Sequence, residues 1–523
     1  MIAIGSVCIA ACQPHPGFGC AEDEQCRNAK GEVGVCFGVG ACAYPDAACA
    51  SGFRYSEHAP PPWGGTCVVP NSDDVSTTTG HGSSSGAPAT TSDGSSSGSS
   101  SSDTANIPEC GNAIVEEDEQ CDDGNAIESD GCNPDCRLSG EQLEAFMSDL
   151  AQHDVALAVV RLPSDDVVIA GYTGDDPADV DAWIARYADG QQSWSFTAAG
   201  TADRNDIATS VALSPQGHAR AAGWVIPSAS KMETPRGQIW IAEVDIDDGQ
   251  ARWQFEDGMP EPANELAHGL VVLPGGDVVI AGRVGAPATA DFAVRRYTIA
   301  DNAGEFEVSN VWARAFDGAA GSSDWAFGLA HDPVGRLVVG GALRTTTDDI
   351  DRHLVALDLA GDPLEPACED FGSDDPLEAD DRISDVAVAP DGAVAAVGFA
   401  TKAEREGRDL WVGYYAVGQC QLTWAKTRVG SGGDDDGATA VAIDDLGRVV
   451  VGGYLNIDNG EDAWLGKYDA EGTLLWEIEP VDGPGNGIDR IDDVIIGSER
   501  EITVAGRMSV PGQVDAWVAR YTP

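Results

Sequence analysis

Seven acidic residues recur at a constant distance before a glycine. Each lies seventeen residues before the glycine that ends a short apolar run, and the set is Asp154, Asp206, Glu265, Asp324, Asp381, Asp436 and Asp489. If the seven side chains share one face, their oxygens could bind Ca²⁺ or a cationic ligand. Alternatively, each carboxylate accepts backbone N–H bonds in its own turn. The recurrence in every unit favours the second interpretation, because a binding site rarely uses all repeats equally.

A second group of oxygen-bearing side chains lies in a cysteine-rich segment, CGNAIVEEDEQCDDGNAIESDGCNPDC at residues 110–136. Asp122, Asp123, Asn125 and Asp130 could ligate Ca²⁺ on a tightly looped backbone. The Asp-Gly and Asn residues also suit turns, which is the simpler interpretation. We therefore expect no cofactor, with Ca²⁺ as the alternative.

Patterns typical of catalysis are missing from the sequence. The eight histidines are scattered without metal-ligand spacing, and no glycine-rich nucleotide motif occurs. We expect His268 and His331 to lie on apolar strands, in the core or along a channel. Paired acids such as Asp434 and Asp435 fit surface turns better than acid–base chemistry. No catalytic residue is assigned.

The elements that must position the acids come from an internal repeat. Seven apolar runs end in Gly171, Gly223, Gly282, Gly341, Gly398, Gly453 and Gly506. An apolar strand precedes each run, an aromatic-rich strand such as DAWIARY (181–187) follows it, and in most copies a Trp-marked fourth strand comes next. Pro-x-Gly segments between the first two strands are typical of hairpin turns. Four-stranded units of this length indicate a seven-bladed β-propeller, with a β-sandwich array as the alternative.

The seventh unit, residues 487–523, lacks a fourth strand. A propeller must close its ring, because an unpaired strand edge leaves backbone groups exposed. The segment EQLEAFMS at 141–148 stands where the missing strand is expected, with Phe146 in place of Trp. We therefore predict closure by this N-terminal strand. The blade pattern resembles bacterial seven-bladed propeller repeats of secreted and surface proteins, a resemblance that implies the fold and not the chemistry.

The fourteen cysteines indicate export. Two dense clusters next to a cysteine-poor body are typical of disulfide modules in an oxidising compartment. The spacing of Cys110, Cys121, Cys132 and Cys136 resembles the cysteine-rich repeat of myxobacterial surface proteins. Further disulfide cysteines are expected in the first cluster, where the pairing stays open: Cys20, Cys26, Cys36, Cys42, Cys49 and Cys67. Cys368 and Cys420 fall near the turns between the third and fourth strands of neighbouring units four and five, so a disulfide between these two is expected.

The N-terminal run ending in IAAC (9–12) resembles a bacterial lipobox, which implies lipid attachment at Cys12. No basic residue precedes this run, a departure from the usual signal pattern. We divide the chain into a signal-like segment (1–19), a cysteine-rich module (20–70), a flexible Ser/Gly/Thr-rich linker (71–108), a four-cysteine repeat (109–139) and the propeller (140–523).

The formal net charge of −57 argues against nucleic acid and anionic lipid as partners. Contact with a membrane is expected through a lipid anchor only, at the cell surface or outer membrane, and a monomer is expected. The first hypothesis is a non-enzymatic surface lipoprotein whose propeller binds a protein or glycan. The alternatives are an extracytoplasmic lyase or hydrolase that uses carboxylates on the ringed face, and a structural component of the envelope or matrix.

Overall fold

The computed structural model describes fourteen segments from Cys110 onward and three short strands before it. The segments are 110–115, 119–148, 152–200, 205–226, 237–258, 264–286, 289–318, 323–346, 349–364, 380–401, 407–416, 421–457, 460–485 and 487–523. Two compact units are formed, residues 1–103 and residues 104–523. In the first, β1 (Val35–Phe37), β2 (Ala41–Pro45) and β3 (Phe53–Tyr55) make one antiparallel sheet, with Cys36 opposite Cys42.

The second unit is built around seven antiparallel sheets, one for each predicted blade. We call the strands of a blade a, b, c and d from the centre outward. Blades one to three are β5 (His153–Arg161), β6 (Val167–Asp176), β7 (Asp179–Ala188), β8 (Gln191–Ala198); β9 (Ile207–Leu213), β10 (Ala219–Val225), β11 (Gln238–Val244), β12 (Ala251–Asp257); and β13 (Leu266–Val272), β14 (Val278–Val284), β15 (Asp291–Asn302), β16 (Glu305–Phe316).

Blade four has three described strands and the other three blades have four. They are β17 (Trp325–His331), β18 (Leu337–Thr346), β19 (Asp349–Leu357); β20 (Arg382–Val388), β21 (Val394–Thr401), β22 (Arg408–Tyr415), β23 (Leu422–Arg428); β24 (Gly437–Ile443), β25 (Val449–Ile457), β26 (Gly460–Tyr468), β27 (Leu474–Glu477); and β28 (Arg490–Ile496), β29 (Ile502–Val510), β30 (Gln513–Tyr521), β4 (Gln142–Met147). The chain is thus an all-β seven-bladed propeller, and the part that the structure describes holds no helix that could cross a membrane.

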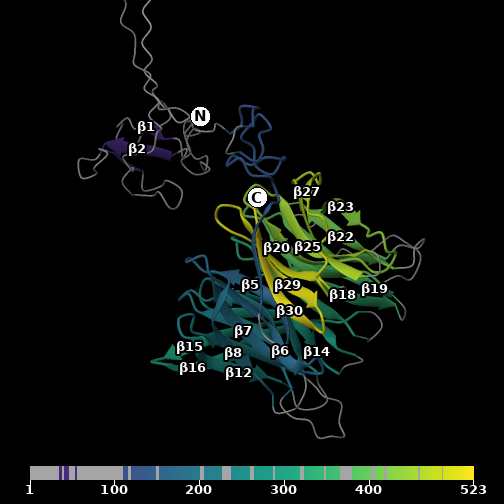
Figure 1. Cartoon of the computed structure of the whole chain (residues 1–523). Coiled ribbons are helices and arrows are strands. Elements are labelled where there is room, and N and C mark those ends of the chain that lie inside the picture. Colours follow the sequence, from purple (N-terminus) through teal and green to yellow (C-terminus); the bar gives the residue numbers. More distant parts are fainter. Residues whose placement is uncertain are drawn as a thin grey trace, which may run out of the picture. The chain divides into compact units, whose positions relative to one another are not determined.

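The last blade is completed by the N-terminal strand, as predicted. Strand β4 pairs antiparallel with β30, and Phe146 lies opposite Val518. The pairing continues past the strand ends, because Ser148 N donates to Ala516 O at 2.9 Å and Thr522 N donates to Glu141 O at 2.9 Å. Figure 1 shows β5 of the first blade beside β29 and β30 of the last, and these strands are in contact. The ring is therefore closed by strands from both ends of the propeller.

The seven repeated glycines of strand b have a steric cause. Opposite each of them strand a is irregular, with a register shift of the kind produced by a β-bulge. A Cβ at Gly171 would overlap the carbonyl oxygen of Val155, and the other six glycines meet the corresponding carbonyl in their own blades. Only glycine lets strand b approach the bulge this closely.

The repeated Trp of strand d fastens one blade to the next. Trp194 packs on Gly249 in the c–d turn of the following blade, and its indole N–H donates to Ile246 O at 2.7 Å. Trp312 and Trp424 repeat this arrangement, with indole N–H bonds to Leu359 O and Ala470 O. Phe146 lacks an N–H donor, and its ring instead stacks on Tyr187 with the centroids 4.9 Å apart.

The four-cysteine segment belongs to the same compact unit as the propeller. It is held by a disulfide between Cys121 and Cys132. Glu128 of this segment forms ion pairs with Arg448 (3.1 Å) and Arg500 (2.8 Å), which follow the a–b turns of blades six and seven. The segment therefore contacts the face opposite the acidic ring.

The other two cysteines of this segment, which are also predicted to form disulfides without a defined partner, are free thiols instead. Cys110 and Cys136 carry thiols that interact with each other. Their S–H groups donate to Asn133 O and to Glu119 Oε1, at 3.3 and 3.1 Å. Desolvation, followed by the neighbouring Cys110 and Glu119, raises the pKa of Cys136 well above its usual range.

Other predicted features fall outside the described residues or outside their described side chains. Cys12, the 1–19 segment and the 71–108 linker are among them. The predicted disulfide cysteines in this group are Cys20, Cys26, Cys36, Cys42, Cys49, Cys67, Cys368 and Cys420.

Candidate functional site

The seven acids of the repeat lie at the starts of the innermost strands, on one face of the propeller. These strands form a closed ring, because each contacts the strand a of the next blade and β28 contacts β5. All seven side chains are buried, with at most 1% of the residue exposed: Asp154, Asp206, Glu265, Asp324, Asp381, Asp436 and Asp489. We call this side of the propeller the acid-ring face.

Four of the acids have the same two backbone partners. Asp324 accepts N–H bonds from Gly318, six residues before it (2.8 Å), and from Arg344, twenty residues after it (2.7 Å). Asp206, Asp436 and Asp489 accept from the equivalent positions of their own blades. Each of these carboxylates thus ties the segment before strand a to the end of strand b.

The other three acids use side-chain partners as well. Asp154 accepts hydrogen bonds from the Thr173 and Ser148 hydroxyls. Glu265 pairs with Arg295 at 2.8 Å. Asp381 pairs with Arg352 at 3.1 Å and accepts the N–H of Thr401 at 2.8 Å. Thr401 lies twenty residues after Asp381, as Arg344 does after Asp324.

These contacts favour the turn interpretation of the ring. Desolvation raises the pKa of Asp206 to about 6, against the N–H bonds from Gly200 and Ile226, which lower it. Asp489 also lies with Asp462 and Asp482 in a group whose carboxylate oxygens are within 4.8 Å of one another. Since Asp489 already accepts two N–H bonds, we assign no metal there, and cation binding by the ring stays a hypothesis without a contact that supports it.

The predicted Ca²⁺ ligands of the four-cysteine segment also form hydrogen bonds with neighbouring protein groups. The Asp122 carboxylate accepts N–H bonds from Gly111, Asn112, Ala113 and Gly124. Asp123 accepts from Asn125 and Cys132, and the Asn125 side-chain amide donates to Asp130 at 3.2 Å. Desolvation acts to raise the pKa of Asp122, but the four N–H bonds lower it overall. This network is that of a turn.

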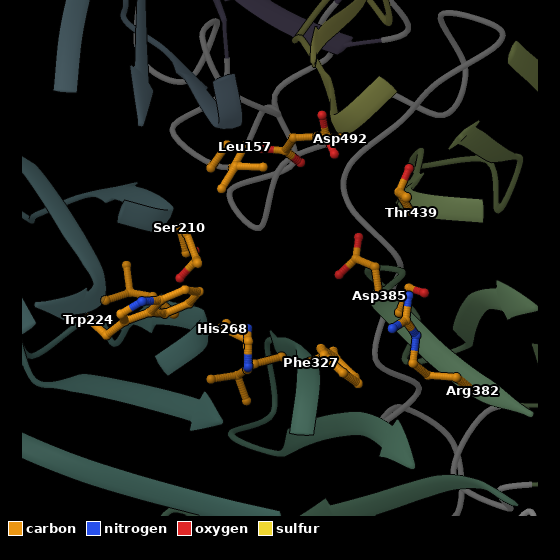
Figure 2. Close-up of a pocket in the computed structure, with 16 residues that line it drawn as sticks. Leu157, Ser210, Trp224, His268, Phe327, Arg382, Asp385, Thr439 and Asp492 are labelled. Carbon is orange, nitrogen blue, oxygen red and sulfur yellow. The ribbon is translucent and has the colours of Figure 1, made fainter. Parts of the chain in front are cut away.

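At the centre of the acid-ring face, the channel between the innermost strands widens into a cavity of about 340 Å³. Figure 2 shows side chains from several blades pointing toward its open centre. Prominent among the lining residues are Trp224, His268, Phe327, Arg382, Asp385 and Asp492. The volume is within the range of small-ligand sites.

Two carboxylates in the channel bridge neighbouring blades. Asp385 accepts the N–H of Val441 at 2.9 Å, and Asp493 accepts the N–H of Val159 at 2.7 Å. Strand a is the inner edge of its sheet, so the N–H groups that point away from strand b have no strand partner. The two carboxylates accept hydrogen bonds from these N–H groups. Desolvation raises the pKa of Asp385 to about 7 and that of Asp493 to about 6.

Arginines stack on aromatic rings in several blades, and two members of this series, Arg382 and Phe327, line the cavity. Arg283 lies over Trp325 (5.7 Å from guanidinium carbon to ring centroid), and Arg382 lies between Phe327 (4.7 Å) and Phe399 (4.9 Å). Arg408 covers Phe399 from the other side, and Arg490 lies over Tyr454 at 4.0 Å in the next blades. We call this series the Arg–aromatic arc.

Sequence reasoning missed this arc, although a positional signal exists. Most members of the arc come directly after a ring acid or directly after a strand-b glycine. These two positions lie opposite each other on strands a and b, as Arg382 and Phe399 do. The residues there differ from blade to blade, so a search for what the blades share passes over them.

His268 lines the cavity next to Phe327 of the arc. Its ring centroid is 5.6 Å from that of Trp224 and 5.0 Å from that of Phe327. Desolvation, and then the charges of Arg283 and Arg382, lower the pKa of His268 to about 3, so the imidazole is neutral at physiological pH. Its Nε2 is buried without a hydrogen-bond partner in the described structure. The other predicted channel histidine, His331, lies at the end of β17 on the opposite face.

Comparison with known family models gives a match to one part of the chain. A family model described as a domain of unknown function (DUF4215) matches residues 99–137, the four-cysteine segment. No curated protein matches the chain in sequence.

Several solved structures share the propeller fold at low identity. A polysaccharide lyase of family PL25, an ulvan lyase, is 13% identical with a TM-score of 0.46, and the match covers 70% of this chain and 93% of that one. An α-L-arabinanase of Penicillium chrysogenum is 14% identical with a TM-score of 0.36 (73% and 97% covered). Drosophila Plexin A in complex with Semaphorin 1b is 8% identical with a TM-score of 0.39 (73% and 87% covered). Such likeness concerns the fold and not the chemistry.

Proposed function

We propose that this chain is a non-enzymatic, extracytoplasmic surface protein whose propeller binds a glycan at the cavity of the acid-ring face. The observation that carries the proposal is the cavity itself, which combines ligand-sized volume with the aromatic side chains of Trp224 and Phe327 in its lining. Aromatic side chains offer large, rigid contact surfaces with which the apolar faces of sugar rings can stack. A protein partner is the alternative, and a concave cavity of this size favours the smaller ligand.

The contacts of the channel carboxylates support binding rather than catalysis. Asp385 and Asp493 each hold a backbone N–H of the neighbouring blade, and the ring acids are engaged in turns. A general acid or base must reach the proton that it transfers. These groups already have structural partners.

One observation keeps an enzyme as the second candidate. Asp385, with its pKa raised by burial to about 7, lines the same cavity as His268 and Arg382. Perturbed carboxyls that converge with such groups are typical of active sites. A lyase or hydrolase would therefore act on the ligand in this cavity.

The proposed location rests on disulfide chemistry. The Cys121–Cys132 disulfide fits an oxidising compartment. Lipid attachment at Cys12 is proposed from the lipobox-like sequence, and mass spectrometry of the native protein tests it: a diacylglyceryl-modified Cys12 is expected, whereas a chain that keeps Met1 contradicts the proposal.

The test of function is a glycan array with the full chain, followed by mass analysis of each bound glycan after incubation. We expect binding that is weakened at least tenfold by Trp224→Ala in the cavity and unchanged by Val334→Ala, whose side chain is exposed on the opposite face. The glycan should be recovered intact. Shortened products would favour the enzyme, and binding to no glycan would contradict the proposal.

A further inference from the structure

We infer that the ligand of this cavity is an acidic glycan, one of whose carboxylate or sulfate groups binds Arg382 beside His268, with Arg283 nearby. The inference rests on the proposed function and adds the chemical class of the ligand. The starting observation is that two arginines near the cavity have no acidic partner among the described residues, which is unexpected in a chain of net charge −57.

Arginines around the site normally have acidic partners. Arg507 forms two hydrogen bonds of 2.8 Å to Asp492, Arg490 pairs with Glu461, and Arg295 pairs with Glu265 at 2.8 Å. Arg283 and Arg382 differ, because no carboxylate of the described residues forms an ion pair with either, and the Nε of each is buried without a hydrogen-bond partner.

Such guanidinium groups are costly to the folded protein. Desolvation lowers the pKa of Arg283. Desolvation also lowers the pKa of Arg382, to about 10; the charges of Arg408 and Arg490 act in the same direction, and Tyr454 acts to raise it. A desolvated charge without a counter-ion destabilises the fold. Groups that cost stability in the free protein are typical of ligand sites.

The stacking geometry leaves the arginines able to bind an anion. The Arg382 guanidinium carbon lies 4.7 Å from the ring centroid of Phe327 and 4.9 Å from that of Phe399, so the aromatic contacts leave its N–H groups without an acidic partner among the described residues. A guanidinium edge binds carboxylate or sulfate oxygens with two parallel hydrogen bonds. A neutral imidazole can add one further N–H, and His268 Nε2 has no partner in the described structure.

The surroundings select against other polyanions. The outer surface is strongly negative, which repels nucleic acid at long range, whereas the local positive charge acts only at the cavity. A glycan with spaced acid groups can place one of them in the cavity while its neutral parts contact the aromatic residues. The inference therefore predicts recognition of single acid groups rather than of dense charge.

The first experiment is thermal unfolding of the full chain in sulfate or in galacturonate, each against chloride at equal ionic strength. Arg382→Met and Arg283→Met should melt higher than the wild type in chloride, because each removes an unpaired buried charge, and should lose the anion-specific rise in melting temperature. Arg314→Met is the matched control, since Arg314 also stacks on a Trp but pairs with Asp362. It should keep the wild-type response. An equal anion response in all four proteins would overturn the inference.

The second experiment measures binding of the same proteins to lightly carboxymethylated dextran, lightly sulfated dextran and unmodified dextran, which distinguishes carboxylate from sulfate and both from a neutral polymer. Binding to an acidic polymer that falls at least tenfold in Arg382→Met supports the inference. If array hits are neutral glycans, or if acidic glycans bind the arginine variants as well as the wild type, the inference fails and the proposed function stands. If no glycan binds at all, both fail.

Discussion

At the scale of single residues, the repeated acids are structural groups first. Asp489 is fully buried and accepts N–H bonds from Gly483 and Ser509. Asp489→Ala should lower the free energy of unfolding by about 1–3 kcal/mol for each donor left unpaired, as measured by urea denaturation. Asp482→Ala, at an exposed neighbour, should be nearly neutral. If Ca²⁺ raised the melting temperature of the wild type and not of Asp489→Ala, the cation interpretation of the ring would be restored.

Asp385 predicts a dependence of stability on pH. Desolvation, with a further contribution from the charge of Asp493, raises the pKa of Asp385 to about 7 from an ordinary value of 3.8. The folded state therefore binds a proton more tightly than the unfolded state, and this carboxyl makes stability fall as the pH rises from about 4 to about 7.

Asp385→Asn removes that titration and keeps an oxygen for the Val441 N–H. Its melting temperature relative to the wild type should rise between pH 4 and pH 8, as followed by calorimetry at several pH values. Parallel profiles for the two proteins would show that Asp385 does not titrate in this range.

At the scale of the elements, the strand-b glycines decide how closely two strands approach. Gly171→Ala should lower the free energy of unfolding by about 1–3 kcal/mol, because the new Cβ would overlap the Val155 carbonyl oxygen. Gly275→Ala is the control, since a Cβ there meets nothing within 4 Å. Equal melting temperatures for the two variants would mean that the backbone of strand a can shift to accommodate the new Cβ, and would contradict the steric explanation.

The closing strand provides the second test at this scale. A chain that starts at residue 150 lacks β4, so β30 loses its outer partner and the cover of Phe146 on Tyr187. It should unfold several kcal/mol more easily than a chain that starts at residue 140, on the scale of a large core truncation. Thermal unfolding of both chains measures the difference, and identical curves would reduce residues 141–149 to a linker.

Ring closure could be predicted from the sequence because it depends on what the blades share. Seven strand-b glycines and a last unit without a fourth strand leave one segment, with Phe146 at the Trp position, to fill the gap. The position of the ring acids followed from the same periodicity. Their partners did not, because Gly318 and Arg344 approach Asp324 only once the blade has folded.

The candidate site depends instead on what the blades do not share. The residue after the ring acid is Arg in blades five and seven, Trp in blade four and aliphatic or glycine elsewhere. These positions converge only around a closed ring, so the arc of Arg283, Trp325 and Arg382 can be found only by comparing the residues that differ between blades at the same repeat position. The thiols of Cys110 and Cys136 show a similar limit, since cysteine spacing does not fix pairing.

At the scale of the whole molecule, the propeller has two distinct faces. The face of the a–b turns contacts the four-cysteine segment through Glu128, which pairs with Arg448 and Arg500. The acid-ring face carries the cavity and the unpaired arginines. A negative exterior with a local positive site would bind an acidic ligand with an affinity that falls as salt rises.

The most direct measurement is hydroxyl-radical footprinting of the full chain with and without a glycan selected on the array. Binding at the cavity predicts protection of Trp224 and Phe327, which line it, with no change at the exposed Val334 and Leu446 of the opposite face. Protection of Val334 and Leu446 while Trp224 stays unprotected would contradict the account.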